Sequence, residues 1–210
     1  MPLARFERLE PERRRKLIEA ATQEFAAQGY DGASLARIAR LAGLSKPAIY
    51  YYFEDKGDIY STVVREAWRR LSPPTQLEFQ SLDAGSFWPA LESFHLASFE
   101  RTREEPWLIA AWKLAYHPPP ASAGAVAEVF EAGRAFLSAL VRRGQELGVV
   151  RADLPEDLLI ALFTGADNAA DHWLVDRWDD LGPEEVERLS RRAFDTMRGL
   201  LAPPGRSPEE

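Results

Sequence analysis

The stretch that most limits how this chain can fold is residues 34–56, SLARIARLAGLSKPAIYYYFEDK. Apolar residues recur at helical spacing in its first half, and a second short helix is expected from Ser45, with Ile49 turned toward the same interior. Ala39 is small enough to let two helices cross closely, and Gly43 can adopt the left-handed backbone of a tight turn at little cost. The spacing therefore predicts a helix-turn-helix.

The N-terminal end of the second helix would point outward, where a recognition helix meets base edges in the major groove of DNA. Three consecutive tyrosines, residues 50–52, follow on this helix, and one short helix cannot bury all three rings. The alternative is an ordinary helical hairpin with an incidental glycine, because small residues at this spacing are common in helical proteins. The outward tyrosines favour the DNA-binding interpretation.

Charge is distributed unevenly along the 210 residues, whose formal net charge is −7. Residues 1–60 carry ten Lys or Arg and nine Asp or Glu, whereas residues 61–210 carry 16 and 24. Only the first sixty residues are not acidic, so affinity for phosphate would depend on where the basic side chains lie. The densest basic run, residues 13–16, is equally well explained as a solvated turn of a helix.

The sequence contains no cysteine, which excludes disulfides and thiolate-bound metals. Its first residues, MPLARFERLEPERRRK, lack the apolar core of a signal peptide. No run approaches the roughly 18 apolar residues of a membrane-spanning helix. We therefore expect a cytoplasmic protein without a membrane partner, with one large or two modest domains.

Helical periodicity and the positions of glycine and proline predict an all-α protein. Pro11 suits the first turn of a helix that Gly29 ends, and the ten residues before Pro11 are expected to form a frayed arm. The next three helices are expected to begin at the N-caps Ser34, Ser45 and Asp55. Five further helices are expected at about 87–99, 107–116, 123–147, 155–178 and 183–201.

From Phe25 to Tyr60 the sequence FAAQGYDGASLARIARLAGLSKPAIYYYFEDKGDIY resembles the TetR/AcrR family of transcriptional regulators. The resemblance implies a three-helix helix-turn-helix DNA-binding domain in residues 1–54, and a helical ligand-binding and dimerisation domain in residues 55–210. It also implies a homodimer whose recognition helices enter successive major grooves of a palindromic operator in double-stranded DNA. Three residues depart from the family pattern, namely Ala33, Tyr52 and Gly57.

The resemblance also assigns DNA contacts to residues of this chain. Base contacts would come from the second helix, where Lys46 could donate to guanine, and Pro47 and Ala48 could meet a thymine methyl group. Phosphate contacts would come from Ser34, the tyrosines and Lys56, although Tyr52 stands where relatives usually have histidine. The expected DNA-binding residues are Ser34, Ser45, Lys46, Pro47, Ala48, Tyr50, Tyr51, Tyr52 and Lys56.

Aromatic residues are frequent after residue 74, and any one of them at helical spacing is explained by a hydrophobic core. The resemblance implies that the helices from about 87 to 178 enclose a pocket for a small-molecule effector. The six tryptophans favour an apolar or aromatic effector, and an acyl-CoA if basic residues 101, 103, 113 or 134 surround the entrance. The expected lining residues are Phe94, Phe99, Trp107, Trp112, Tyr116 and Phe130.

The helix expected at 155–178 contains an unusual polar group, Asp167, Asn168, Asp171 and His172, in an otherwise apolar segment. Asn168 and His172 could orient the effector, and we include both among the expected ligand-binding residues. A metal site is a second interpretation, but no partner ligands with recognisable spacing accompany these residues. A solvent face or a polar contact at the dimer interface is a third.

The sequence offers little support for an enzyme, because it has three histidines, no nucleotide-binding glycine loop and no recognised nucleophile arrangement. A DNA-binding protein without an effector is the other alternative, although residues 75–210 exceed what dimerisation alone requires. We therefore predict an effector-responsive repressor that is not an enzyme and uses no cofactor or metal. The effector would shift the population of conformations and change the separation of the two recognition helices.

Overall fold

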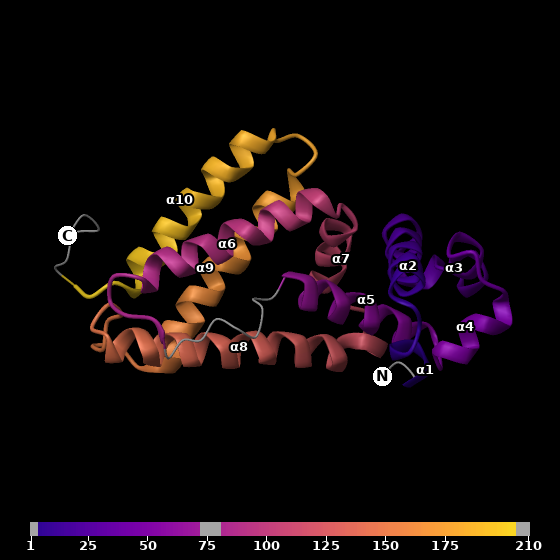
Figure 1. Ribbon diagram of the computed structural model, residues 1–210, viewed down its shortest axis with the longest axis horizontal. Coiled ribbons are helices and arrows are strands. Elements are labelled where there is room, and N and C mark those ends of the chain that lie inside the picture. The colour runs from indigo at the N-terminus through magenta and orange to yellow at the C-terminus, as the bar shows by residue number, and fades with distance from the viewer. Residues whose placement is uncertain (1–3, 72–80, 205–210) are drawn as a thin grey trace. The chain divides into compact units, whose positions relative to one another are not determined.

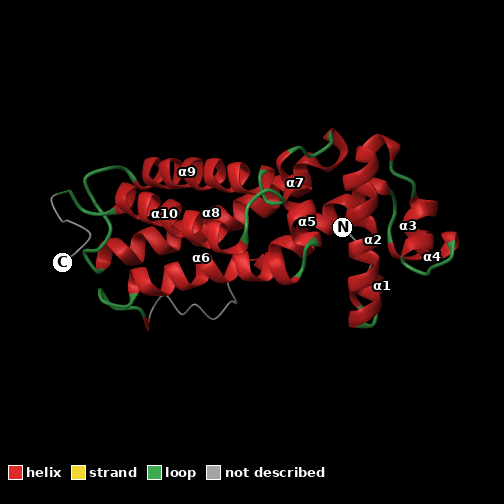
Figure 2. Ribbon diagram, turned by 90° about the horizontal axis from the view of Figure 1, so that it is seen from above, coloured by secondary structure: helices red, strands yellow, loops and turns green. Residues whose placement is uncertain are grey.

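The computed structural model describes residues 4–71 and 81–204, and every regular element in these ranges is a helix (Figures 1 and 2). The all-α prediction is therefore confirmed. The chain divides into two compact units: unit 1 comprises residues 1–72 and 102–130, and unit 2 comprises residues 73–101 and 131–210. The boundary expected at residue 54 divides DNA binding from ligand binding and dimerisation, not one packing unit from the other. It stays a prediction. None of the helices in the described ranges has the length and apolar composition needed to cross a bilayer.

Unit 1 contains the N-terminal helices, and its helix boundaries follow local sequence signals. Pro11 begins α2, and Gly29 takes φ 65° near the end of that helix. The Asp55 carboxylate accepts a hydrogen bond of 2.8 Å from the Asp58 amide and so caps α5. The elements of unit 1 are α1 (Ala4–Glu7), α2 (Pro11–Gly32), α3 (Leu35–Leu41), α4 (Lys46–Tyr52), α5 (Lys56–Leu71), α7 (Trp107–Tyr116), η2 (Pro120–Ser122) and the first turns of α8 (Ala123–Glu146).

The prediction of a frayed N-terminal arm is wrong for residues 4–9. Ala4–Glu7 form the short helix α1, and the ring of Phe6 is completely buried, with its centroid 5.0 Å from that of Phe53. The guanidinium of Arg14 lies 5.3 Å from the centroid of the Phe6 ring on another side. The arm is ordered because one aromatic side chain fills a space beside the end of α4, which local periodicity does not reveal.

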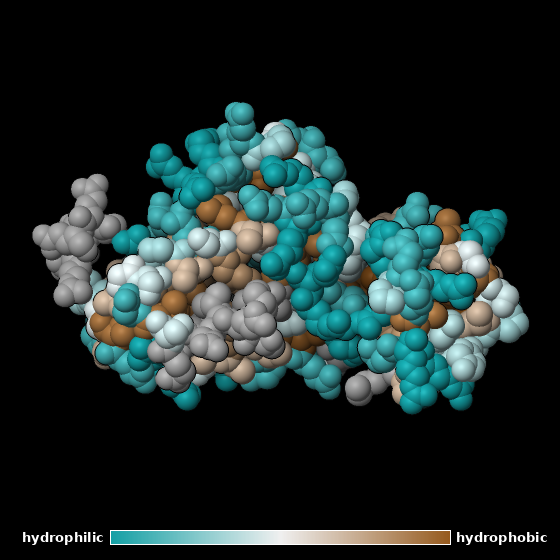
Figure 3. Space-filling model, viewed as in Figure 1, coloured by the Kyte–Doolittle hydropathy of each residue, from teal (hydrophilic) through white to brown (hydrophobic). Residues whose placement is uncertain are grey.

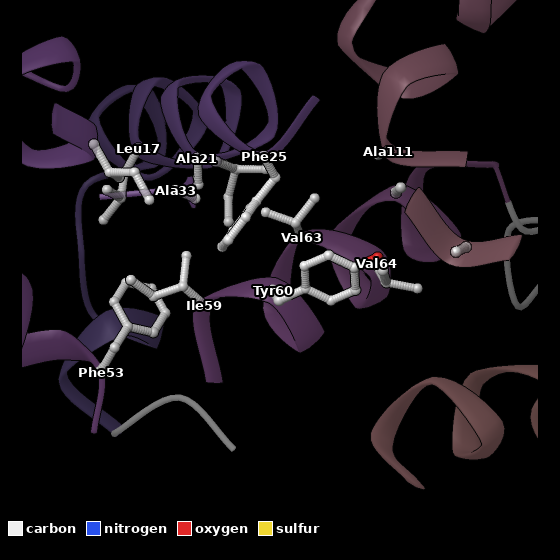
Figure 4. Close-up of a cluster of buried hydrophobic side chains, with 14 of the residues drawn as sticks. Leu17, Ala21, Phe25, Ala33, Phe53, Ile59, Tyr60, Val63, Val64 and Ala111 are labelled. Carbon is white, nitrogen blue, oxygen red and sulfur yellow. The ribbon is translucent and has the colours of Figure 1, made fainter. Parts of the chain in front are cut away.

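One hydrophobic core joins α2, α5 and α7 in unit 1. Figure 4 shows Phe25 of α2 beside Tyr60 of α5, and their ring centroids are 5.1 Å apart. The Tyr60 hydroxyl donates a hydrogen bond of 2.6 Å to the carbonyl of Leu114 in α7. Burial raises the pKa of Tyr60 to about 12, so the phenol keeps its proton and remains a donor. Helix α7 is thus bonded to the same core that supports α3 and α4.

Unit 2 has its own core, formed by α6 (Phe87–Glu104) up to residue 101, the rest of α8, α9 (Glu156–Asp176) and α10 (Pro183–Leu201). Helix α9 ends two residues before the predicted limit, because the chain turns at Arg177. Hydrophobic residues also reach the surface of this unit in patches among hydrophilic ones (Figure 3). The buried core consists of Phe87, Leu91, Leu140, Val141, Val150, Leu159, Ile160, Phe194, Met197 and Leu201.

Gly144 is the position in α8 where this core tolerates no side chain. A Cβ atom there would overlap Cγ2 of Val150 and lie 2.8 Å from Cζ of Phe87. We expect Gly144→Ala to lower the free energy of unfolding by about 1–3 kcal/mol, as overpacked cores do. Urea denaturation would measure the loss.

The matched control for Gly144 is Gly199→Ala on α10, where no atom lies within 4 Å of an added Cβ. That substitution should raise stability by a few tenths to about 1 kcal/mol, because alanine favours the helix. Equal effects at the two glycines would contradict the packing described for Gly144.

Candidate functional site

Helices α3 and α4 form the predicted helix-turn-helix, and Figure 1 shows α3 beside α2 and α4 next to α3. Gly43 takes φ 68° in the turn, and the amide of Leu44 donates a 2.8 Å hydrogen bond to the carbonyl of Ala39. Ala39 and Ile49 are buried where the two helices cross. The backbone hydrogen bond of the turn and the packing of Ala39 and Ile49 therefore fix the angle between α3 and α4, as the sequence predicts.

The N-terminal end of α4 is accessible. Ser45, Lys46 and Pro47 are exposed and Ala48 is half-buried, whereas Ile49 is buried. Ser45 occupies the N-cap position with an extended backbone, but its hydroxyl makes no capping bond and is free to face outward. The first turn of α4 is therefore exposed to solvent, whereas Ile49 in the next turn is anchored in the core.

The three tyrosines of α4 divide into two kinds. Tyr50 and Tyr51 are 51% and 52% exposed, so they are available for outside contacts, whereas Tyr52 packs against the core of unit 1. The guanidinium of Arg5 in α1 lies 4.5 Å from the centroid of the Tyr51 ring. A cation therefore stands beside Tyr51, which the sequence analysis did not anticipate.

An ion pair with a buried carboxylate positions the start of α3, and sequence reasoning missed it. Glu24 of α2 is 5% exposed, and its carboxylate accepts 2.8 Å from the Ser34 amide and 2.7 Å from Nε of Arg37. The Ser34 hydroxyl is half-buried and lies 3.5 Å from the Arg37 amide, at the limit of a capping bond. The available signal was a glutamate beside Phe25 in an otherwise apolar stripe. Glu24 and Arg37 are positioning residues for the helix-turn-helix.

Lys56 has a structural role in addition to the predicted contact with phosphate. Its Nζ atom donates 3.0 Å to the carbonyl of Asp31 and 3.4 Å to that of Ala33, and it lies 4.7 Å from the ring centroid of Tyr30. These bonds satisfy backbone acceptors at the C-terminal end of α2. An ammonium group has three protons, so a phosphate contact remains a prediction for Lys56.

The expected effector residues of unit 1 all take part in packing contacts. Nε1 of Trp112 donates 3.1 Å to the hydroxyl of Tyr116, and the Trp112 ring stacks on Trp68 with centroids 6.3 Å apart. Nε1 of Trp107 donates 3.1 Å to Glu105, and Phe130 packs on the core. These contacts do not test whether the residues line a pocket.

In unit 2, the expected aromatic residues meet other rings. Phe94 lies 6.2 Å from Phe136, and Phe99 lies 5.1 Å from His95 and 6.4 Å from Trp178, between centroids. Burial lowers the pKa of His95, whose Nε2 atom is 3.3 Å from the carbonyl of Ser190. This neutral ring was not among the expected residues.

The polar group of α9 separates into an outer and an inner part. Nδ1 of His172 lies 3.2 Å from the carboxylate of Asp176, and both side chains are about half exposed, while Asn168 is half-buried. Asp167 differs, because burial raises its pKa to about 6. In the described part of the chain, no three His, Cys, Asp or Glu residues form a group that could hold a metal ion.

Comparison with known proteins adds three observations. Residues 17–63 match the family model described as bacterial regulatory proteins, tetR family. The HTH-type transcriptional regulator BetI of Klebsiella pneumoniae (strain 342) is 30% identical over 116 residues, which are 53% of this chain and 59% of BetI. The chain thus spans little more than half the length of this curated relative.

Two solved structures share the fold over most of both chains. FadR from Bacillus subtilis in complex with stearoyl-CoA has a TM-score of 0.73 at 17% identity, covering 89% of this chain and 98% of FadR. SmeT, the repressor of the Stenotrophomonas maltophilia multidrug efflux pump SmeDEF, has a TM-score of 0.72 at 17% identity, covering 93% and 94%.

The exposed first turn of α4, held by the α2 and α3 core, defines a helix-turn-helix protein with a second helical unit. The matched segment, residues 17–63, runs from α2 through the helix-turn-helix into α5. The family model thus confirms the predicted resemblance to the TetR family over residues 17–63.

Proposed function

We propose that this chain is a transcriptional repressor that binds a palindromic operator as a homodimer and releases it when a small effector binds. The observation that carries the proposal is the exposed N-terminal turn of α4, whose opposite face is fixed by buried Ile49. A short helix held in this way fits a major groove with its first residues against the base edges. Selection of genomic fragments on the purified protein tests the proposal. Enrichment of an inverted repeat is expected, and its absence would contradict it.

Lys46→Ala tests base recognition directly. A lysine that donates to guanine O6 and N7 is worth about 1–3 kcal/mol at its base pair, so the substitution should weaken operator binding by that amount and relax one position. Fluorescence anisotropy with a randomised operator set would measure both effects.

The control for Lys46 is Lys16→Ala, which removes an exposed lysine of α2 that pairs with Glu12 at 3.5 Å. Lys16→Ala should leave the base preference unchanged. If Lys46→Ala preserves the wild-type preference at every operator position, Lys46 does not read a base.

The homodimer is supported by an unusual apolar face on α9. Leu158, Leu162 and Trp173 are 43%, 42% and 44% exposed, and their spacing places them on one side of the helix with Ala169. Large apolar side chains that share a face in this way are typical of an interface rather than of a free surface. We propose that α9 meets its copy in the second subunit, with α10 beside it.

The effector is proposed to be small and apolar or aromatic, with an acyl-CoA as one candidate. FadR of Bacillus subtilis was solved with stearoyl-CoA, which supports an effector in a protein of this fold. A thermal-shift panel that includes acyl-CoA tests this, because a ligand that binds the folded state raises the melting temperature. An effector must also weaken operator binding, since coupling between two sites is reciprocal. A protein stabilised by no compound would be a DNA binder without an effector.

A further inference from the structure

We propose that the effector carries a positive charge, and that Asp167 of α9 binds the charge while aromatic side chains of unit 2 contact its apolar part. This inference rests on the proposed function and names its ligand class. The ligand would be an organic amine or quaternary ammonium compound with an apolar or aromatic body.

The first observation is a stretch of unit 2 in which the helices contribute partly buried rather than fully buried side chains. Residues 92–101 of α6, 131–139 of α8 and 161–173 of α9 include no fully buried residue. Buried residues flank this stretch of α9, with Leu159 and Ile160 before it and Leu174 and Val175 after it. Along the stretch, partly buried residues such as Phe136 and Phe163 pack against the core, and the inward side chains stay partly accessible.

The second observation is that polar residues of α9 occupy its inward face along this stretch. Thr164, Asp167 and Asp171 follow Ile160 at intervals of four, three and four residues, and Leu174 follows three residues later. Residues at these intervals share one face of a helix. Because Ile160 and Leu174 are buried, the three polar side chains between them face the interior of unit 2.

The Thr164 hydroxyl is a second polar group of this face, observed independently of Asp167, that could bind a ligand. Its Oγ1 atom is buried, and no hydrogen-bond partner for it exists among the described residues. A buried polar group without a partner costs free energy, so native proteins rarely retain one unless water or a ligand supplies the bond. The hydroxyl lies three residues before Asp167, one helical turn away.

Asp167 is a carboxylate of this face whose ionisation is disfavoured by burial. Part of its surface is accessible, yet protein surrounds the group closely enough for burial to raise its pKa to about 6. At neutral pH the carboxyl group is still mainly ionised, so a cationic ligand would offset its negative charge.

The side chains of unit 2 suit an organic cation better than a metal ion. The rings of Phe94, Phe99, Phe136 and Trp178 belong to the same unit, and aromatic faces attract ammonium groups. Metal ions such as Mg²⁺ or Ca²⁺ need several oxygen ligands, and no group of three acidic or histidine side chains occurs in the described residues. The negative charge of Asp167 also disfavours the phosphates of an acyl-CoA at this position.

Two matched series of probes test the inference with the full chain. The first is benzyltrimethylammonium, benzyl alcohol and phenylacetate, and the second is tetraphenylphosphonium, triphenylphosphine oxide and tetraphenylborate. Calorimetry should show that at least one cation binds about tenfold or more tightly than its neutral and anionic counterparts. That cation should also weaken operator binding. Preference for a neutral or anionic probe, or no cation binding up to about 1 mM, would overturn the inference.

The variant Asp167→Asn identifies the residue. Cation affinity should fall about tenfold or more while affinity for the neutral probe is unchanged. The control Asp176→Asn removes an exposed carboxylate from the same helix and should change neither affinity. Equal losses for all probes in Asp167→Asn would overturn the assignment.

Folding and DNA binding provide the remaining controls. Burial raises the pKa of Asp167 in the folded state, so the free energy of unfolding falls as pH rises through about 6 and this carboxyl group ionises. Asparagine stays neutral, so Asp167→Asn should melt at a higher temperature than wild type at neutral pH. Operator binding without ligand is measured for each variant. A protein that binds an operator but shows no preference for cations would contradict this inference alone. A protein that binds no operator would contradict the proposed function.

Discussion

Leu162→Glu is expected to convert the protein into a monomer and to weaken operator binding by about 10²–10⁴-fold. Leu162 is 42% exposed at the centre of the apolar face of α9, so a charge there would be buried without a partner in the proposed dimer. A monomer would lose the second, effectively intramolecular binding event at a two-half operator. Analytical ultracentrifugation and anisotropy with full and half operators would measure both changes.

The control for this experiment is Ala127→Glu, which adds the same charge at an exposed position of α8. Ala127→Glu should remain dimeric and bind the full operator normally. Half-operator binding should be similar in all three proteins, since α4 is untouched. A dimeric Leu162→Glu protein with wild-type affinity would show that another surface joins the subunits.

Phe6→Ala is expected to lower the free energy of unfolding by about 3–5 kcal/mol, the usual range for a buried phenylalanine. The Phe6 ring is fully buried between Phe53, which follows α4, and the guanidinium of Arg14. Its loss would release α1 and leave a cavity beside the C-terminal end of α4. We therefore expect weaker operator binding even under conditions where the variant remains folded.

Two controls separate packing from charge in the Phe6 experiment. Phe6→Leu keeps most of the apolar volume and should cost less than Phe6→Ala. Arg8→Ala changes an exposed residue just after α1 and should have an effect within about 0.5 kcal/mol on stability. Urea denaturation measures each value. A stability loss below about 1 kcal/mol for Phe6→Ala would contradict the burial of this ring.

Features set by neighbouring residues could be predicted from the sequence. Gly43 takes the left-handed conformation expected in the turn, and Asp55 caps α5. Gly29, expected to end its helix, interrupts α2 with φ 65°, and the helix continues to Gly32. The crossing of α3 and α4 was also predictable, because Ala39 and Ile49 fall at fixed distances from the turn. Each of these features depends on a few consecutive residues whose geometry the chain itself enforces.

Features that depend on distant partners could not be predicted. The order of α1 depends on Phe6 meeting Phe53, and the start of α3 depends on Glu24 of α2 reaching Arg37. The position of Glu24 beside Phe25 suggests burial, but nothing near it in the sequence identifies Arg37 as its partner. These pairings arise only once α2 is packed, so periodicity carries no signal for them.

The polar group of α9 shows the same limit within a single helix. The sequence identifies the group as unusual but cannot say which of its members face inward. The structure turns Asp167 toward the interior and pairs His172 with Asp176 at an accessible edge. The inward direction is set by Ile160 and Leu174, which are buried on either side. Whether Asn168 and His172 meet the effector stays a prediction.

The bond from the Tyr60 hydroxyl to the Leu114 carbonyl has a consequence for genetics. It connects α7 to α5, the helix that directly follows α4, although the two segments are far apart in the chain. A screen for alleles with altered promoter control should therefore return substitutions in α7 as well as in α4. Substitutions in α7 would alter promoter control although every side chain expected to face DNA is unchanged.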